Sequence, residues 1–172
     1  MKHINVEIKP RCFHPEKVEA FLLQHNAVFK GTDHQKDTYF NVPNGRLKLR
    51  QGNIENSLIF YQRNDQAGPK QSDFDLLKIA QGPELEQLLQ NALGVKVIVE
   101  KKRKIFFLDN VKIHLDELET LGSFVEIEAG NITAPDKTVE ELHQQCHHLM
   151  GAFGIKEEDL IQNSYSDMIL RP

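Results

Sequence analysis

Two glutamates, Glu126 and Glu128, lie two positions apart in a segment that alternates polar and apolar residues. Strand side chains point to opposite faces with a period of two, so both carboxylates are expected on one face, about 6.7 Å apart. Two carboxylates placed in this way can bind one hard divalent cation, or a pair of cations about 3.5–4 Å apart. The spacing therefore indicates a candidate site for Mg²⁺ or Mn²⁺.

A row of cations occurs in another alternating segment. Arg46, Lys48 and Arg50 are separated by leucines, so the three charges share one face of a predicted strand. Neighbouring cations about 6.7 Å apart repel by roughly 2.5 kcal/mol at an effective dielectric constant near 20. Water and salt remove most of this repulsion on a solvated face. Inside a closed sheet an anion would have to compensate it.

Several other predicted strands carry charge on one face in the same way. The same-face charges are Glu7, Lys9, Lys48, Arg50, Arg63, Lys101, Arg103, Asp116, Glu126 and Glu128. Periodicity alone leaves two arrangements open, in which these faces form either a solvated surface or the inside of a barrel. In the second arrangement, six cations and four carboxylates leave an excess of two positive charges. One bound Mg²⁺ or Mn²⁺ raises the excess to four, which matches the charge of about −4 on a triphosphate.

The elements that would position these residues follow from hydrophobic periodicity and turn signals. We expect strands at 3–11, 36–41, 46–52, 57–63, 72–79, 95–108, 111–116 and 124–128, with a loop at 64–70. Helices are predicted at 15–26, 83–94 and 136–153, and a helical turn at 156–161. Residues 163–170 form a short terminal strand or a docking tail.

Two of the predicted helices carry apolar residues at the spacing of a core stripe. In the second helix these are Leu85, Leu88, Leu89 and Leu93, and in the third Val139, Leu142, Cys146, Leu149, Met150 and Phe153. His143, His147 and His148 on the third helix are interpreted as solvated residues rather than metal ligands. About eight strands in hairpin order with interspersed helices predict an α+β fold with an antiparallel sheet. So many strands in one domain, 1–172, must close or nearly close to hide their edges.

Composition narrows the functional class. The chain has 172 residues and a net charge of −4, which argues against a general binder of nucleic acid or of anionic membranes. The two cysteines, Cys12 and Cys146, form no metal-binding motif and are expected to be reduced thiols. The sequence shows no apolar segment typical of a signal peptide or a membrane span, so we expect a cytoplasmic protein. Monomer and homodimer are equally compatible with the pattern.

An ordered set of segments covers nearly the whole chain. It consists of Glu7-Ile8-Lys9, LKLR, YQR, the KxR of Lys101 and Arg103, HLDELETLGSFVEIE and SYSD. This set resembles the CYTH family, whose fold is shared by class IV adenylyl cyclases and thiamine triphosphatases. YQRNDQAGPKQSDF and LGVKVIVEKKR look closer to the bacterial class IV adenylyl cyclase-like branch. The resemblance implies an eight-stranded antiparallel tunnel that holds a triphosphate together with Mg²⁺ or Mn²⁺.

The resemblance also implies roles for individual residues. Metal ligands would be Glu7, Asp116, Glu126 and Glu128. Phosphate-binding residues would be Lys9, Lys48, Arg50, Arg63, Lys101 and Arg103, with Tyr165 closing one end. Among these, a catalytic set would consist of Glu7, Lys9, Arg63 and Glu126.

One residue departs from the family pattern. The N-terminal signature of the family is Glu-x-Glu-x-Lys, and Asn5 occupies its first position here. This removes one negative charge from the expected metal site and weighs against a second metal ion and against full hydrolytic activity. Three functions remain open. They are cyclisation of ATP to cyclic AMP, hydrolysis of ATP, thiamine triphosphate or inorganic triphosphate, and binding of a triphosphate or polyphosphate without turnover.

Overall fold

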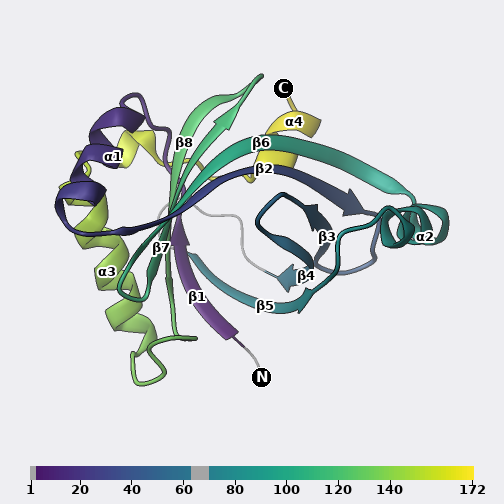
Figure 1. Ribbon diagram of the computed structural model, residues 1–172, viewed down its shortest axis with the longest axis horizontal. Helices are drawn as coiled ribbons and strands as arrows, with labels where there is room; N and C mark the ends of the chain where they lie inside the picture. The colour runs from purple at the N-terminus through teal and green to yellow at the C-terminus, as the bar shows by residue number, and fades with distance from the viewer. Residues whose placement is uncertain (1–2, 63–69) are drawn as a thin grey trace.

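The computed structural model describes residues 3–62 and 70–172, and its central feature is a closed antiparallel barrel of eight strands (Figure 1). The order around the barrel is β1-β5-β4-β3-β2-β6-β7-β8, and β8 pairs with β1 to close it. The strands are β1 His3–Ile8, β2 Val28–Phe40, β3 Arg46–Gln51, β4 Asn56–Gln62, β5 Lys70–Lys78, β6 Val95–Leu108, β7 Val111–Leu118 and β8 Gly122–Gly130. This confirms the predicted α+β fold with a closed antiparallel sheet.

Four helices flank the barrel. They are α1 Pro15–Gln24, α2 Glu84–Leu93, α3 Val139–Ala152 and α4 Tyr165–Leu170, with one further helical turn at Glu157–Asp159. Helices α1 and α3 lie on one side of the barrel and α2 lies at the far end of β2 and β6 (Figure 1). The turns predicted at Asn44-Gly45 and at Asp109-Asn110 join β2 to β3 and β6 to β7. Gly45 and Asp109 have φ values of 63° and 52°, which a tight turn requires.

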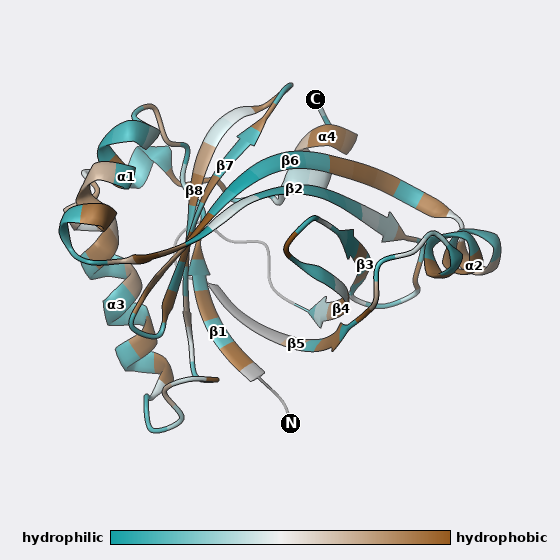
Figure 2. Ribbon diagram, in the orientation of Figure 1, coloured by the Kyte–Doolittle hydropathy of each residue, from teal (hydrophilic) through white to brown (hydrophobic). Residues whose placement is uncertain are grey.

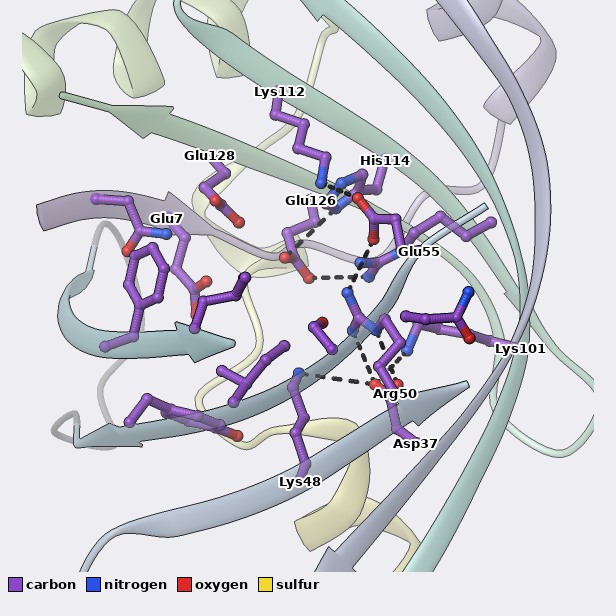
Figure 3. Close-up of a pocket in the computed structure, with 18 of the residues that line it drawn as sticks. Glu7, Asp37, Lys48, Arg50, Glu55, Lys101, Lys112, His114, Glu126 and Glu128 are labelled. Carbon is purple, nitrogen blue, oxygen red and sulfur yellow. Dashed lines mark hydrogen bonds and ion pairs between the residues drawn. The ribbon is translucent and has the colours of Figure 1, made fainter. Parts of the chain in front are cut away.

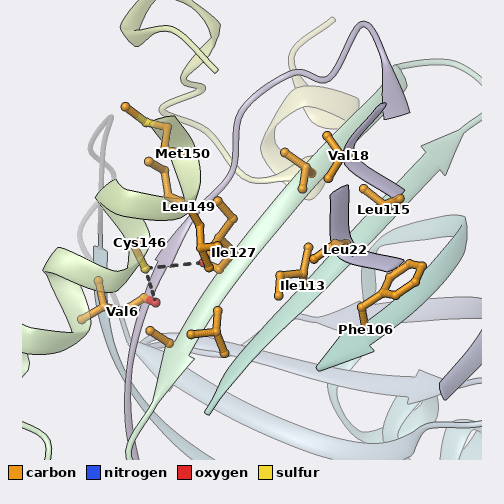
Figure 4. Packing of buried hydrophobic residues seen from close by; sticks show 14 of the residues in the cluster. Val6, Val18, Leu22, Phe106, Ile113, Leu115, Ile127, Cys146, Leu149 and Met150 are labelled. Atoms are coloured by element: carbon orange, nitrogen blue, oxygen red, sulfur yellow. Dashed lines mark hydrogen bonds between the residues drawn. The ribbon is translucent and has the colours of Figure 1, made fainter. Parts of the chain in front are cut away.

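The larger of two hydrophobic clusters lies outside the barrel, between its wall and the helices α1 and α3 (Figure 4). The smaller cluster includes Tyr39, Ile59 and Tyr61, which line the cavity of the barrel. Strands β1, β6, β7 and β8 contribute their outward apolar faces, and Val18, Leu22, Leu142, Cys146 and Leu149 cover them from the helices. Hydrophilic and hydrophobic residues alternate along β1 and are mixed along the flanking helices (Figure 2). The faces that carry most of the charged residues therefore point into the barrel, because the helices cover the outward apolar faces. On β6 the inward face also carries the buried Val97 and Val99.

Three predictions about the elements need correction. The strand expected at 36–41 begins at Val28, because β2 pairs with β6 from Val28 to Phe40 around irregularities between Phe29 and Gly31 and between Tyr39 and Phe40. The segment allowed as a terminal strand forms helix α4, whose capping box between Ser164 and Asp167 favours a helix start. The leucines of α2 do not form a core stripe, since α2 has no buried residue and packs only at the barrel end.

Candidate functional site

The charged faces of the strands point into the barrel. A cavity of about 470 Å³ lies there, and Glu7, Lys9, Lys48, Arg50, Lys101, Arg103, Glu126, Glu128 and Tyr165 are among its lining residues (Figure 3). Arg50, Lys101 and Arg103 are each less than 8% exposed to solvent. The solvated arrangement that periodicity left open is therefore wrong. Arg63 and the loop predicted at 64–70 lie outside the described residues, apart from Lys70 at the start of β5.

One side of the cavity is a cluster of cations around Asp37. Arg50 donates from Nε and Nη2 to the two carboxylate oxygens of Asp37, each at 2.8 Å. Lys101 Nζ donates to Asp37 Oδ2 at 2.8 Å, and Lys48 Nζ lies 3.6 Å from the same oxygen. Burial alone would raise the pKa of Asp37, but the charges of Arg50 and Lys101 hold this pKa well below its ordinary value. The carboxylate thus occupies the centre of a site that suits an anion.

The opposite side of the cavity carries three carboxylates. Glu7 on β1 and Glu126 and Glu128 on β8 each present an oxygen, and these oxygens lie within 4.8 Å of one another. Pairing of β1 with β8 places Glu7 directly opposite Glu128, which brings together residues more than 100 positions apart. Three carboxylates are a hard oxygen donor set of the kind that Mg²⁺ and Mn²⁺ prefer. The residues therefore fit the divalent cation expected from the sequence.

Glu126 connects the carboxylates to the cations. Its Oε2 lies 3.4 Å from Lys9 Nζ and 3.4 Å from Arg103 Nη2, while Oε1 lies 3.5 Å from His114 Nδ1. Burial would raise the pKa of Glu126, but Lys9 and Arg103 lower this pKa well below its usual range. Burial also lowers the pKa of His114, and the charge of Arg103 adds to this shift. The site thus combines an ionised glutamate with an imidazole that favours its neutral form.

Asp116 lies apart from the three carboxylates. Arg103 donates to both of its oxygens at 2.6 Å, and the hydroxyl of Tyr165 donates to Oδ2 at 2.8 Å. Burial raises the pKa of Tyr165 well above its ordinary value, so this hydroxyl keeps its proton. In the structure Asp116 orients Arg103 and anchors Tyr165, which begins helix α4 at this end of the cavity.

Several charged or titratable residues that line the cavity were not predicted as site residues. Among them are Asp37, Glu55, Lys112 and His114. Lys112 and His114 lie on the same strand face as Asp116, and Asp37 lies on the same face as Tyr39. The alternation of the sequence could therefore have identified these three residues as members of the site. Glu55 belongs to no strand and lies in the hairpin between β3 and β4, where no periodicity exists.

These additions change the charge balance of the cavity. Among the described residues, the buried or half-buried cations at the site are Lys9, Lys48, Arg50, Lys101, Arg103 and Lys112. The carboxylates are Glu7, Asp37, Glu55, Asp116, Glu126 and Glu128. Six cations therefore face six carboxylates. The excess of two positive charges expected from the sequence does not hold for this set, because Asp37 and Glu55 were missing from that count and Arg63 lies outside the described residues.

Asn5 lines the same cavity at the carboxylate side. It is 6% exposed, and its Oδ1 has no hydrogen-bond partner among the described residues. An unpaired buried carbonyl oxygen is costly and usually marks a site completed by water, an ion or a ligand. Asn5 thus provides a neutral oxygen beside Glu7 at the position where the sequence pattern led us to expect a carboxylate.

Comparison with known proteins agrees with this geometry. The CYTH domain model matches residues 3–165. A Methanocaldococcus jannaschii protein named "Putative adenylate cyclase MJ0240" is 25% identical over 178 residues, covering 96% of this chain and 98% of that protein.

Solved structures share the fold. A conserved hypothetical protein from Pyrococcus furiosus superposes with a TM-score of 0.79 at 23% identity, covering 95% of this chain and 98% of the other. A Hippeastrum protein described as a "putative adenylyl cyclase" with a dominant triphosphatase activity has a TM-score of 0.58 at 16% identity, covering 96% of this chain and 94% of the other. In the described part of the chain, no helix is long and apolar enough to cross a membrane. The closed barrel, its charged interior and the match to nearly the full chain show that this protein belongs to the CYTH domain family.

Proposed function

We propose that the protein is a metal-dependent enzyme that acts on a nucleoside triphosphate, with cyclisation of ATP to cyclic AMP and pyrophosphate as its first candidate reaction. The proposal rests on one observation, that a set of buried cations and a cluster of three carboxylates face each other in a single cavity. Buried cations suited to phosphate oxygens face three carboxylates suited to a divalent cation. Such an arrangement binds both parts of a metal–triphosphate complex at once.

Phosphates would bind along the cationic side. Arg50, Lys48 and Lys101 already surround a carboxylate, Asp37, and their N–H groups can be shared with phosphate oxygens. Lys9 and Arg103 both lie next to Glu126, one of the three carboxylates. In the cyclisation the ribose 3′-hydroxyl attacks the α-phosphorus and pyrophosphate leaves. Lys9 and Arg103 would stabilise the negative charge that develops on the phosphate oxygens.

A divalent cation would be held by Glu7, Glu126 and Glu128. When bound, Mg²⁺ or Mn²⁺ supplies positive charge that neutralises and orients the phosphate oxygens. Asn5 Oδ1 adds a neutral oxygen beside these glutamates and leaves the local charge one unit less negative than a carboxylate would. We therefore propose a single divalent cation, and Glu7, Lys9, Arg63 and Glu126 as the catalytic set.

The cavity also favours a substrate with an organic group. Beyond the charged residues its lining includes the apolar Ile59 and Phe74 and the aromatic Tyr39 and Tyr61. An inorganic triphosphate would leave this apolar surface unused, whereas a nucleoside could contact it. This lining favours ATP over inorganic triphosphate among the candidate substrates.

Hydrolysis is the second candidate reaction. A water molecule would attack the terminal phosphorus, the bridging P–O bond would break, and orthophosphate would be released, while the same residues bind the phosphates. The dominant triphosphatase activity described for the Hippeastrum protein, which shares the fold, supports this alternative. Because both reactions would use the same metal-binding and phosphate-binding residues, the reaction product distinguishes them.

The test is product analysis with the purified chain. ATP, thiamine triphosphate and inorganic triphosphate are incubated separately with Mg²⁺ and with Mn²⁺, and products are separated by chromatography. Cyclic AMP with pyrophosphate supports the cyclase, and orthophosphate without cyclic AMP supports the hydrolase. Glu126→Gln should lower either activity at least about tenfold, while Glu117→Gln, an exposed glutamate on β7, should leave it unchanged. No turnover of any substrate would contradict an enzymatic function and favour a triphosphate-binding module.

A further inference from the structure

The hairpin that joins β3 to β4 places one carboxylate, Glu55, in the cavity. Glu55 Oε2 accepts hydrogen bonds from Arg50 Nη1 and Gln35 Nε2, both at 3.1 Å. Its other oxygen forms an ion pair with Lys112 of β7. Figure 3 shows Lys112 and Glu55 pointing toward each other across the cavity. The cyclisation and hydrolysis described above assign no part to this pair.

The ion pair joins two opposite walls of the barrel. In the strand order, β3 is separated from β7 by β2 and β6 on one side, and β4 is separated from β7 by β5, β1 and β8 on the other. A contact between the β3–β4 hairpin and β7 therefore has to cross the interior. The Glu55–Lys112 pair spans the cavity at the end of the barrel where the hairpin lies.

The backbone of the hairpin is fixed to β2. Asp33, which is fully buried, accepts hydrogen bonds from the backbone N–H groups of Ile54 and Glu55, each at 2.9 Å. Asn53 accepts from the N–H of His34 at 2.7 Å and donates to the carbonyl of Thr32 at 3.1 Å. The backbone at Glu55 is therefore held in place by hydrogen bonds to β2. Moving Glu55 out of the cavity would require breaking these hydrogen bonds.

Glu55 also stands at the end of the cationic row. Along β3 the order is Lys48, Arg50 and then the hairpin with Glu55. Lys112 and Arg50 lower the pKa of Glu55 far below its ordinary value despite its burial, so the carboxylate is ionised at neutral pH. A phosphate chain lying along the row meets cations first and a fixed negative charge last.

We propose that Glu55 determines the length of the phosphate chain that the cavity accepts, so that a triphosphate fits and a longer linear polyphosphate is rejected. The inference rests on the proposed triphosphate site and deepens it. A chain that extends past Arg50 must bring further phosphates beside Glu55 or separate Glu55 from Lys112. Both steps are unfavourable because like charges repel and because the remaining buried charge would lose its partner.

The experiment measures binding rather than turnover. Affinities of the full chain for inorganic triphosphate and for a long linear polyphosphate are determined by calorimetry at low ionic strength, for wild type, Glu55→Gln and Glu100→Gln. Glu100 lies exposed on the outer face of β6 and controls for the loss of one negative charge. Glu55→Gln should raise the affinity for the long chain, relative to triphosphate, by about tenfold, and Glu100→Gln should leave this ratio unchanged.

A second variant should change the ratio of the two affinities in the opposite direction. Lys112→Met removes the cation that partly neutralises Glu55, so the long chain should be rejected more strongly relative to triphosphate. An unchanged ratio in both variants, with tight triphosphate binding, would overturn the inference and leave the proposed function standing. A wild-type protein that binds the long chain as well as triphosphate would also overturn it. A wild-type protein that binds neither anion would instead contradict the proposed function.

Discussion

At the scale of single residues, Asp37 holds the cationic side of the cavity together. It is 1% exposed and bonds to Arg50, Lys101 and Lys48, which come from two different strands. Without Asp37, less negative charge would offset the repulsion between these buried cations. Asp37 therefore stabilises the empty site in the way that a bound phosphate would stabilise the filled one.

Asp37→Asn tests this description. Removing one partner of a buried ion pair leaves uncompensated charge, so we expect the free energy of unfolding to fall by about 3–5 kcal/mol. Inorganic triphosphate should restore more stability in the variant than in wild type, because phosphate oxygens can replace the lost carboxylate. Urea unfolding with and without triphosphate measures both effects. Asp75→Asn, at an exposed position on β5, is the control, and equal losses in the two variants would contradict the role of Asp37.

Lys101 gives a prediction about pH. Burial, together with the charges of Arg50 and Arg103, lowers the pKa of Lys101 to about 7, whereas an unfolded lysine titrates near pH 10.4. Between these values the unfolded chain binds a proton that the folded chain does not, so this group makes stability rise with pH, by up to about 1.4 kcal/mol per unit. Urea unfolding at pH 7, 8 and 9 should show the slope that Lys101 contributes as a difference between wild type and a variant without this lysine, because the raised pKa values of the buried Cys12 and Cys146 thiols act in the opposite direction in both proteins.

The matched variants are Lys101→Met and Lys102→Met. Lys101→Met should lose the slope, while Lys102→Met should keep it because Lys102 is exposed on the outer face of β6. If the wild-type and Lys101→Met curves run parallel, Lys101 is charged in the folded protein throughout this range.

The alternation of the sequence predicted most of the inward-facing charged residues, but it could not identify the residues with which they form ion pairs. Lys101 and Arg103 are buried, and Lys102 between them is exposed, as period two requires. The partners come from distant strands, such as Asp37 for Arg50, and depend on the register between strands. Glu55 could not be predicted for another reason. It lies in a hairpin loop, which has no periodicity from which the direction of a side chain could be inferred.

At the scale of elements, pairing extended a strand beyond its local signal. Residues 28–35 mix glycine, charged and apolar residues without clean alternation, yet they pair along β6 with one irregularity between Phe29 and Gly31. Strand formation there depends on the neighbouring strand and not on intrinsic preference. Helix α2 shows the reverse case, because its leucine spacing is helical while the barrel offers it no face to cover. Leu88 is accordingly 63% exposed.

Helix α4 is short and depends on Tyr165 for its attachment. The hydroxyl donates to Asp116, the ring packs edge-on against Phe124 with centroids 5.0 Å apart, and Arg46 pairs with Asp167. Tyr165→Phe should lower the free energy of unfolding by about 1.5–3 kcal/mol, the usual cost of losing a hydrogen bond to a charged group. Tyr165→Ala should cost more, because the ring contact is lost as well. Chemical denaturation ranks the two variants. Equal losses would show that the ring contact contributes nothing, and a Tyr165→Phe variant as stable as wild type would show that the hydroxyl contributes nothing.

At the scale of the whole molecule, the larger hydrophobic cluster and the cavity lie on opposite sides of the barrel wall. Leu142 of α3 is buried in the outer core with Leu22 and Ile127, while the cavity is lined mainly by polar and charged residues. Leu142→Ala should therefore cost about 2–5 kcal/mol of stability without changing the affinity of the folded protein for inorganic triphosphate. Leu88→Ala, at the exposed position on α2, should change neither quantity. A large loss of triphosphate affinity in folded Leu142→Ala would show that the outer core also tunes the site.

The position of β1 in the barrel has a consequence for biosynthesis. β1 is the first of the eight barrel strands in the sequence; it pairs only with β5 and β8, and β8 ends at Gly130. The barrel cannot close until β8 has been made. Until then the edge of β1 that pairs with β8 lacks its native partner, whereas β5, the partner of the other edge, is available earlier. Long-range pairing of this kind is slow and exposes strand edges to other chains. The nascent protein is therefore most vulnerable to aggregation just before the segment that supplies Glu126 and Glu128 emerges, so closure of the barrel and completion of the carboxylate cluster occur in the same late step.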